Sequence, residues 1–153
     1  MDALTLLKDD HDQLKKLMEE LDGTTERGVK TRERLFTRIQ QDLTVHEEIE
    51  EEIFYPALKE HPKAKEIVLE GYEEHNVVDM VMEEITNVPY DDETWGAKFT
   101  VMKENVEHHI EEEEGEMFTK ARQVFDRAEL EDLGERMSVR KTEAQREIAG
   151  SNR

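Results

Sequence analysis

The 153-residue sequence contains no cysteine, and it has only three prolines and seven glycines. Without cysteine, disulfide bonds, a thiolate nucleophile, sulfur-ligated zinc and iron–sulfur clusters are all excluded. The shortage of proline and glycine favours long helices over a fold rich in turns. The length corresponds to one domain of ordinary size that can bury a hydrophobic core.

Basic residues are outnumbered by acidic ones, and long apolar runs are lacking. Forty Asp and Glu residues outnumber 21 Lys and Arg residues, which gives a formal net charge of −19. Such a chain repels nucleic acid and anionic lipid, so we expect neither as a partner. No apolar run approaches the roughly 18 residues that span a bilayer, and the first ten residues lack a basic segment ahead of an apolar one. We therefore expect a cytoplasmic protein.

Apolar residues recur at steps of three and four residues, which is the helical period, in four long segments. The predicted helices cover about residues 2–21, a segment that ends near Pro56, about residues 63–86, and residues 95–124. A shorter helix should follow, because Asp126 and Glu129 have the spacing of a reciprocal N-terminal cap. The predicted fold class is therefore all-α.

One histidine interrupts each of the four apolar stripes. The four residues are His11, His46, His75 and His109. A single histidine on an apolar face is usually a satisfied core residue, but four in successive helices indicate a shared role. Glu50 and Glu113 fall on the same faces, four residues after a histidine. Burying an ionised carboxylate without a partner costs several kcal/mol, so the pattern predicts a positive partner for both.

The chain also repeats itself. The segment from His11 matches the segment from His75, and the segment from His46 matches the segment from His109. Each copy offers one histidine and then His-x-x-x-Glu, whose two side chains share a helix face. An approximate two-fold axis between the copies brings together six candidate metal ligands: His11, His46, Glu50, His75, His109 and Glu113.

Imidazole and carboxylate ligands without sulfur favour iron, manganese or zinc, whereas magnesium and calcium prefer oxygen ligands. The internal two-fold symmetry favours two ions over one. If each glutamate bridges and each histidine binds once, coordination positions remain open on two roughly octahedral ions. The pattern therefore predicts a metal centre that a small exogenous molecule can reach.

The motifs His, His-x-x-x-Glu-Glu-x-x-Phe-Tyr-Pro, His and His-x-x-x-Glu-Glu-x-x-Met-Phe run in this order from His11 to about Ala121. This order resembles the hemerythrin-like HHE cation-binding family. The resemblance implies an up-down-up-down four-helix bundle over residues 1–125 with an additional C-terminal helical tail over residues 126–153. It also implies two iron ions with an oxo or hydroxo bridge, held by the six candidate ligands, with manganese or zinc as substitutes.

The resemblance further implies a small diatomic molecule or peroxide as the ligand: O2, NO or peroxide. Oxygen-carrying hemerythrins have His-x-x-x-His on the third helix, whereas Asp79 lies four residues after His75 here. This difference argues against reversible oxygen carriage. Those proteins also place the last carboxylate five residues after its histidine, so Glu114 competes with Glu113. The internal repeat favours Glu113, which matches Glu50.

Two functions remain open on the sequence. One is a di-iron protein that binds, senses or converts a small oxidant, including peroxide- or NO-linked oxidoreductase activity. The other is a non-catalytic module that senses or buffers iron. A metal-free acidic bundle is disfavoured, because it would bury Glu50 and Glu113 in the core without a positive partner. The other glutamates of the two motifs, among them Glu47 and Glu51, are interpreted as solvated surface, as is His108.

Overall fold

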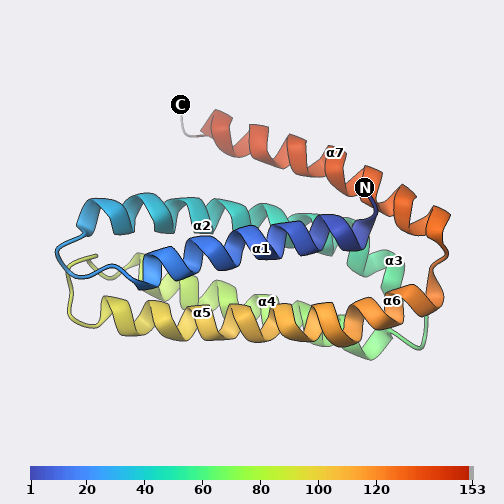
Figure 1. Cartoon of the computed structure of the whole chain (residues 1–153), viewed down its shortest axis with the longest axis horizontal. Helices are drawn as coiled ribbons and strands as arrows, with labels where there is room; N and C mark the ends of the chain where they lie inside the picture. Colours follow the sequence, from blue (N-terminus) through green and yellow to red (C-terminus); the bar gives the residue numbers. More distant parts are fainter. Residues whose placement is uncertain (152–153) are drawn as a thin grey trace.

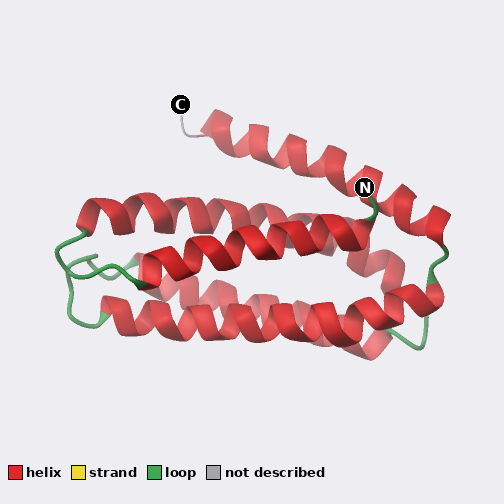
Figure 2. Cartoon of the chain, viewed as in Figure 1, coloured by secondary structure: helices red, strands yellow, loops and turns green. Residues whose placement is uncertain are grey.

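The computed structural model describes residues 1–151, and Figure 2 shows helices joined by short loops over this range. In chain order the elements are α1 (Ala3–Asp22), α2 (Val29–Ile49), η1 (Glu50–Phe54), α3 (Tyr55–Lys59), α4 (Lys65–Thr86), α5 (Trp95–Glu112), η2 (Glu113–Met117), α6 (Phe118–Val124) and α7 (Arg127–Ser151). The two η elements are single π-helical turns, in which backbone hydrogen bonds join residues five apart. None of the helices in the described range is both long and apolar enough to cross a membrane.

Four antiparallel rods form the bundle (Figure 1). Two rods are the single helices α1 and α4, and the other two are the continuous runs α2–η1–α3 and α5–η2–α6. The loops after α1 and α4 lie at one end of the bundle, and the loop after α3 lies at the other. α7 packs outside α1 and α2 as a fifth helix. The predicted up-down-up-down bundle with an additional C-terminal helix is therefore confirmed.

The second rod ends near Pro56, as the sequence predicted, but the proline itself does not stop the helix. The helix passes through the π turn η1 and continues in α3 to Lys59. Pro56 occupies the first turn of α3, where a missing backbone N–H and a fixed φ are tolerated. In a regular α-helix a proline ring clashes with the carbonyl group four residues earlier. The π turn just before Pro56 replaces that hydrogen-bond pattern with bonds between residues five apart, so the helix continues through the proline.

A polar layer separates two apolar clusters inside the bundle. The cluster nearer the α1–α2 loop is built around Trp95, and the other surrounds Phe54 and extends under α3, α6 and α7. Along α1, His11 lies between Leu7 of one cluster and Leu14 of the other. The apolar clusters thus shield the predicted ligands from water on both sides.

The tail helix α7 begins at the reciprocal cap that the sequence predicted. The Glu129 backbone N–H donates to Asp126 Oδ1 over 2.8 Å, and the Asp126 backbone N–H donates to Glu129 Oε1 over 3.1 Å. Leu133 and Met137 then pack into the apolar cluster around the end of the bundle. Gly134 lies so close to the start of α1 that a Cβ there would overlap the backbone of the first three residues.

Two basic side chains join the middle of α7 to the acidic bundle. Arg140 pairs with Glu52 at 2.7 Å and with Glu48 at 3.5 Å. Lys141 pairs with Asp10 of α1 at 2.6 Å. These two basic residues of α7 therefore lie where the negative charge of the bundle attracts them.

Replacing Gly134 with alanine is predicted to weaken the docking of α7. The added Cβ would overlap the start of α1, and overpacking of this kind costs about 1–3 kcal/mol. Gly150→Ala is the matched control, because a Cβ at that position in α7 meets no atom within 4 Å. Urea unfolding should show a loss of stability for the first variant only, and equal midpoints for the two variants would contradict the tight packing at Gly134.

Candidate metal centre

The structure brings the six candidate ligands together in the bundle interior. They are His11 of α1, His46 of α2, Glu50 of η1, His75 of α4, His109 of α5 and Glu113 of η2. Their exposed fractions range from 0 to 7%. Four histidines and two carboxylates from all four rods thus form the polar layer between the apolar clusters.

The ligand atoms of these residues form two groups of four. The first position consists of His11, His46, Glu50 and Glu113, and the second position consists of Glu50, His75, His109 and Glu113. All ligand atoms within a group lie within 4.8 Å of one another. Donors on opposite sides of one ion with bonds of about 2.1 Å are about 4.2 Å apart, so each group has nearly the size of a coordination shell. Glu50 and Glu113 belong to both positions.

The two positions have closely similar geometry. In the first position, the Nε2 atoms of His11 and His46 lie 3.1 and 3.0 Å from the nearest shared carboxylate. In the second position, the corresponding distances for His75 and His109 are 3.2 and 3.1 Å. The two ring centroids are 4.9 Å apart in each pair. The internal repeat of the sequence therefore reappears as an approximate two-fold symmetry of the centre.

A carboxylate holds the other ring nitrogen of every histidine. The Nδ1 contacts are His11 with Glu114 at 2.7 Å, His46 with Asp10 at 3.0 Å, His75 with Glu51 at 2.8 Å and His109 with Glu74 at 2.8 Å. An ionised carboxylate only accepts hydrogen bonds, so Nδ1 carries the proton and Nε2 is left to face the centre. Histidines that bind metals are commonly oriented in this way.

Four buried polar atoms of the centre have no hydrogen-bond partner within the described chain. They are His11 Nε2, His46 Nε2, Glu50 Oε2 and Glu113 Oε1. A buried polar group left without a partner costs about 1–3 kcal/mol. Neutral Nε2 atoms and carboxylate oxygens all offer lone pairs, so a cation between them satisfies both kinds of donor. The residues present therefore fit a pair of metal ions.

When no metal is bound, protons on the histidines supply the positive charge that the buried carboxylates need. Burial disfavours the charged form of His109, but hydrogen bonds to Glu113 and Glu74 outweigh burial and raise the pKa of His109 to about 10. Burial also opposes protonation of His46, yet the charge of Glu50 holds its pKa well above the usual value. Burial opposes ionisation of Glu113, but hydrogen bonding to Glu50 and the imidazoles holds its pKa well below the usual range. The centre therefore stabilises positive charge.

The π turns position the two shared carboxylates. Glu50 is the first residue of η1 and Glu113 is the first residue of η2, at equivalent points of the repeat. The next residue along each turn, Glu51 or Glu114, contacts a histidine Nδ1 on another rod. Each π turn thus directs one carboxylate into the centre and its neighbour toward a ligand. Turns of this kind often occur at functional sites.

Tyr55 belongs to the second position only, and the sequence analysis did not select it. Its hydroxyl donates to Glu113 Oε2 over 2.7 Å and lies 3.5 and 3.4 Å from the two imidazole Nε2 atoms of that position. Gly71 makes room for it, since a Cβ there would lie 3.0 Å from the hydroxyl oxygen. Phe118 stands at the equivalent place in the repeat. The sequence held no clear signal for it, because Tyr55 reaches the centre through the π turn, whose backbone hydrogen bond joins its N–H to Glu50 O.

The interpretation of Glu47 and Glu51 as solvated surface was wrong. Glu51 contacts His75 Nδ1, and Glu47 is only 9% exposed. Burial and contact with the Asp79 carboxyl raise the pKa of Glu47 to about 9. Because a regular helix turns both glutamates away from the stripe of His46, periodicity alone could not reveal their roles.

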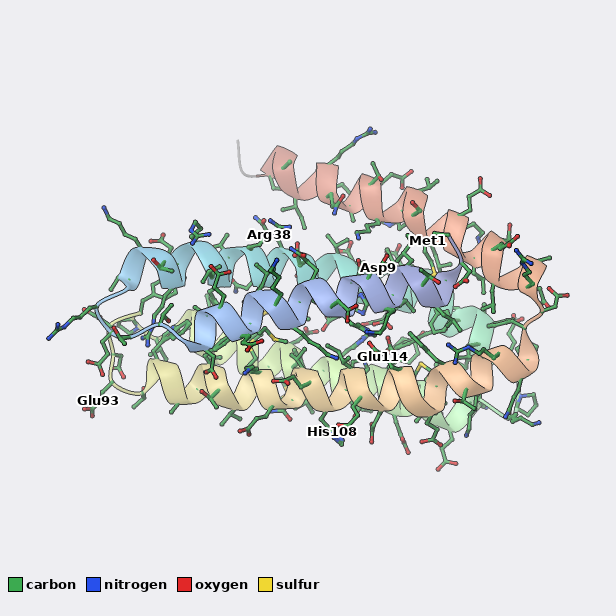
Figure 3. All side chains as sticks on the ribbon, in the orientation of Figure 1. Met1, Asp9, Arg38, Glu93, His108 and Glu114 are labelled. Atoms are coloured by element: carbon green, nitrogen blue, oxygen red, sulfur yellow. The ribbon has the colours of Figure 1, made fainter. Side chains whose placement is uncertain are left out.

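Two other residues that the sequence analysis weighed lie outside both positions. Glu114 contacts His11 Nδ1, so it faces a ligand, whereas Glu113 belongs to both groups of donors. The His108 side chain is 66% exposed and points away from the bundle, as Figure 3 shows. The adjacent histidines of the sequence therefore face opposite environments.

A small cavity adjoins the centre. It is lined by all four histidines, by Glu47 and by the apolar side chains of Leu14, Leu43, Val78, Val106 and Ile110. Glu47 is therefore the one carboxyl group in an otherwise imidazole and apolar lining. Its volume of about 10 Å³ holds roughly one water-sized molecule, so only a very small, weakly polar ligand fits it.

The fold and this set of donors define a class of protein, a four-helix bundle with a cation-binding centre in its core. The family model of the hemerythrin HHE cation binding domain matches residues 2–121. The chain belongs to this family, and it is a hemerythrin-like cation-binding domain with buried histidine and glutamate groups that are able to hold metal.

A solved structure agrees with the family assignment. The crystal structure of a hemerythrin HHE cation binding domain-containing protein from Mycobacterium kansasii is 27% identical and has a TM-score of 0.86. The similarity covers 95% of this chain and 88% of that chain. No curated protein matches this sequence significantly.

The metal-free protein is predicted to lose stability as the pH rises. The pKa of His109 is about 10 in the folded chain and about 6.5 when unfolded, so its stabilising contribution is fully present below pH 6.5 and is lost through pH 10. The difference of about 3.5 between these two pKa values corresponds to a loss of at most about 5 kcal/mol. The melting temperature of metal-free protein between pH 6.5 and 9.5 measures it.

The histidine doublet supplies the control for this experiment. His109→Gln should flatten the pH dependence, whereas His108→Gln should leave it unchanged because His108 is exposed. Zinc-loaded protein should also show a flatter dependence, since metal binding requires neutral imidazoles. A metal-free protein that melts at the same temperature across this range would contradict the raised pKa.

Variants of neighbouring carboxylates are predicted to separate the shared ligands from the orienting ones. Glu50→Ala and Glu113→Ala each remove a donor from both positions, so metal content should fall from two ions per chain toward one or none. Glu51→Ala leaves the donors intact and should lower affinity about 10–100-fold at unchanged stoichiometry. Metal analysis after desalting, with the exposed Glu111→Ala as an unaffected control, distinguishes these cases. Two tightly held ions in Glu113→Ala would show that Glu113 is not a donor shared by both positions.

Proposed function

We propose that the centre holds two iron ions, one at each position, and that the protein binds, senses or converts a small oxidant such as O2, NO or peroxide. The observation that carries this proposal is the sharing of Glu50 and Glu113 between two groups of four donors. When bound, two bridged iron ions would supply reversible redox chemistry toward such a molecule.

The donor set supports iron over other common ions. Four imidazoles disfavour magnesium and calcium, and the absence of sulfur ligands disfavours copper(I). A structural zinc site closes with four ligands of its own, whereas the two positions here share two of their four donors. Roughly octahedral ions with four protein donors retain open places for an oxo or hydroxo bridge and a small molecule.

The surrounding carboxylates support a redox role. Each histidine donates Nδ1–H to a carboxylate, which raises the basicity of the nitrogen that faces the centre. Two further carboxylates, Glu50 and Glu113, lie inside the centre. This concentration of negative charge favours cations of higher charge, so it favours ferric over ferrous iron.

The cavity beside the centre supports a small oxidant as the ligand. Its leucine, valine and isoleucine side chains exclude bulky or charged molecules. The Glu47 carboxyl has a pKa of about 9, so at neutral pH it carries a proton at the wall of the cavity. A protonated carboxyl is a hydrogen-bond donor to a reduced oxygen species and a source of one proton. Glu47 therefore suits a function in which oxygen or peroxide is reduced.

Anaerobic loading with Fe²⁺ followed by hydrogen peroxide tests the proposal. We expect two irons per chain and a near-ultraviolet or visible absorption that changes on oxidation. Two Fe²⁺ ions reduce one peroxide, so consumption beyond one peroxide per centre would require turnover by disproportionation of peroxide. Glu113→Ala should lose both the absorption change and the consumption. Titration with NO under the same conditions identifies the preferred ligand by its spectral change.

The outcomes separate the two functions that the sequence left open. Two irons with turnover support an oxidoreductase, and two irons with a spectral change but no turnover support an oxidant sensor. Iron that exchanges freely, with no change toward O2, NO or peroxide, supports the iron-sensing or iron-buffering module. A chain that takes up no iron contradicts the proposal.

A further inference from the structure

The four carboxylates that contact the histidine Nδ1 atoms are called the outer carboxylates. Lysines neutralise the two that belong to the first position. Asp10, which holds His46 Nδ1 at 3.0 Å, pairs with Lys141 of α7 at 2.6 Å. Glu114, which holds His11 Nδ1 at 2.7 Å, lies 3.7 Å from Lys8. Both of these carboxylates therefore have a positive charge on the side away from the centre.

The outer carboxylates of the second position have no such neutralisation. Within residues 1–151, no lysine or arginine lies within 4.0 Å of Glu51 or Glu74. Their neighbours are further acidic groups, because Glu51 forms a cluster with Glu47, and Glu74 forms a cluster with Glu112 and the exposed His108. The internal repeat equates Glu51 with Glu114, so the difference in charge lies between equivalent sites.

The inner lining differs in the same direction. Tyr55 brings an oxygen to within 3.5 Å of the imidazole nitrogens of the second position, whereas Phe118 presents only a ring to the first. A cation at the second position thus meets more oxygen atoms and fewer neighbouring positive charges. A cation at the first position faces Lys141 and Lys8 behind its ligands.

We propose that the two metal positions are unequal, with the second position filling first and binding tightly, and that Lys141 of the tail helix weakens the first position through Asp10 and His46. The inference rests on the proposed two-metal centre. Lys141 lowers the electron donation that Asp10 gives to His46, and its charge repels the incoming cation. Lys141 is a positioning residue, since it acts through Asp10 and touches no ligand.

A difference between two binding events does not by itself establish unequal positions. The ions share Glu50 and Glu113, so the first ion repels the second even in a fully symmetric centre. The internal repeat resolves this difficulty, because His11 and His75 are equivalent residues of the two positions. In a symmetric centre, their removal would have equal effects. In an unequal centre, the effects differ.

Calorimetric titration of the metal-free protein with Fe²⁺ under anaerobic conditions provides the test. The wild-type chain should show two events whose dissociation constants differ at least about tenfold. His11→Ala should keep the tight event and lose the weak one, whereas His75→Ala should lose the tight event. Equal effects of these two variants would overturn the inequality while leaving the two-metal proposal intact. Absence of any iron binding in the wild type would overturn both.

Variants of α7 test the role of Lys141 separately. Lys141→Gln keeps a hydrogen-bond donor for Asp10 but removes the charge, so the weak event should tighten about threefold to tenfold. Lys141→Arg should retain the wild-type value. Arg140→Gln is the control for docking of α7, because its partners Glu48 and Glu52 contact no ligand, and it should change the weak event less than twofold. A weak event that is unchanged or weaker in Lys141→Gln would overturn this role.

Discussion

The rest of the structure depends on two carboxylates, Glu50 and Glu113, buried at the centre of the bundle between four imidazoles. Negative charge in this position is unstable unless positive charge accompanies it. Protonated histidines supply that charge in the metal-free chain, and metal ions replace the protons in our account. The apolar clusters on either side keep water from the carboxylates, and the π turns direct them inward. The fold is thus arranged around a place for cations.

The internal sequence repeat matches the symmetry of the centre, and differences between the two copies make its halves unlike. Both copies retain the histidines, the shared glutamate and the outer carboxylates at equivalent positions. The copies differ at Tyr55, whose equivalent in the repeat is Phe118. They also differ because α7 brings Lys141 to one side of the centre only. A tail helix outside the bundle thereby gains influence over one half of a buried site.

Helical periodicity and the internal repeat were sufficient to predict the bundle and the grouping of six residues, because both depend on which face of a helix a residue occupies. They could not predict the π turns, which depend on backbone hydrogen bonds that leave no clear residue pattern. The helix through Pro56, the contact of Glu51 with His75 and the approach of Tyr55 all follow from those turns. The docking of α7 depends on the fit of Gly134 to the start of α1, a long-range contact that local patterns do not contain.

The central claim is that Glu50 and Glu113 join two metal positions in one buried layer. A crystal structure of the iron-loaded protein, with anomalous scattering measured at the iron absorption edge, tests it most directly. The account predicts two anomalous peaks per chain, one beside His11 and His46 and the other beside His75 and His109, with both glutamates in contact with both peaks. A single peak, peaks outside this layer, or a glutamate that contacts only one ion would contradict the account.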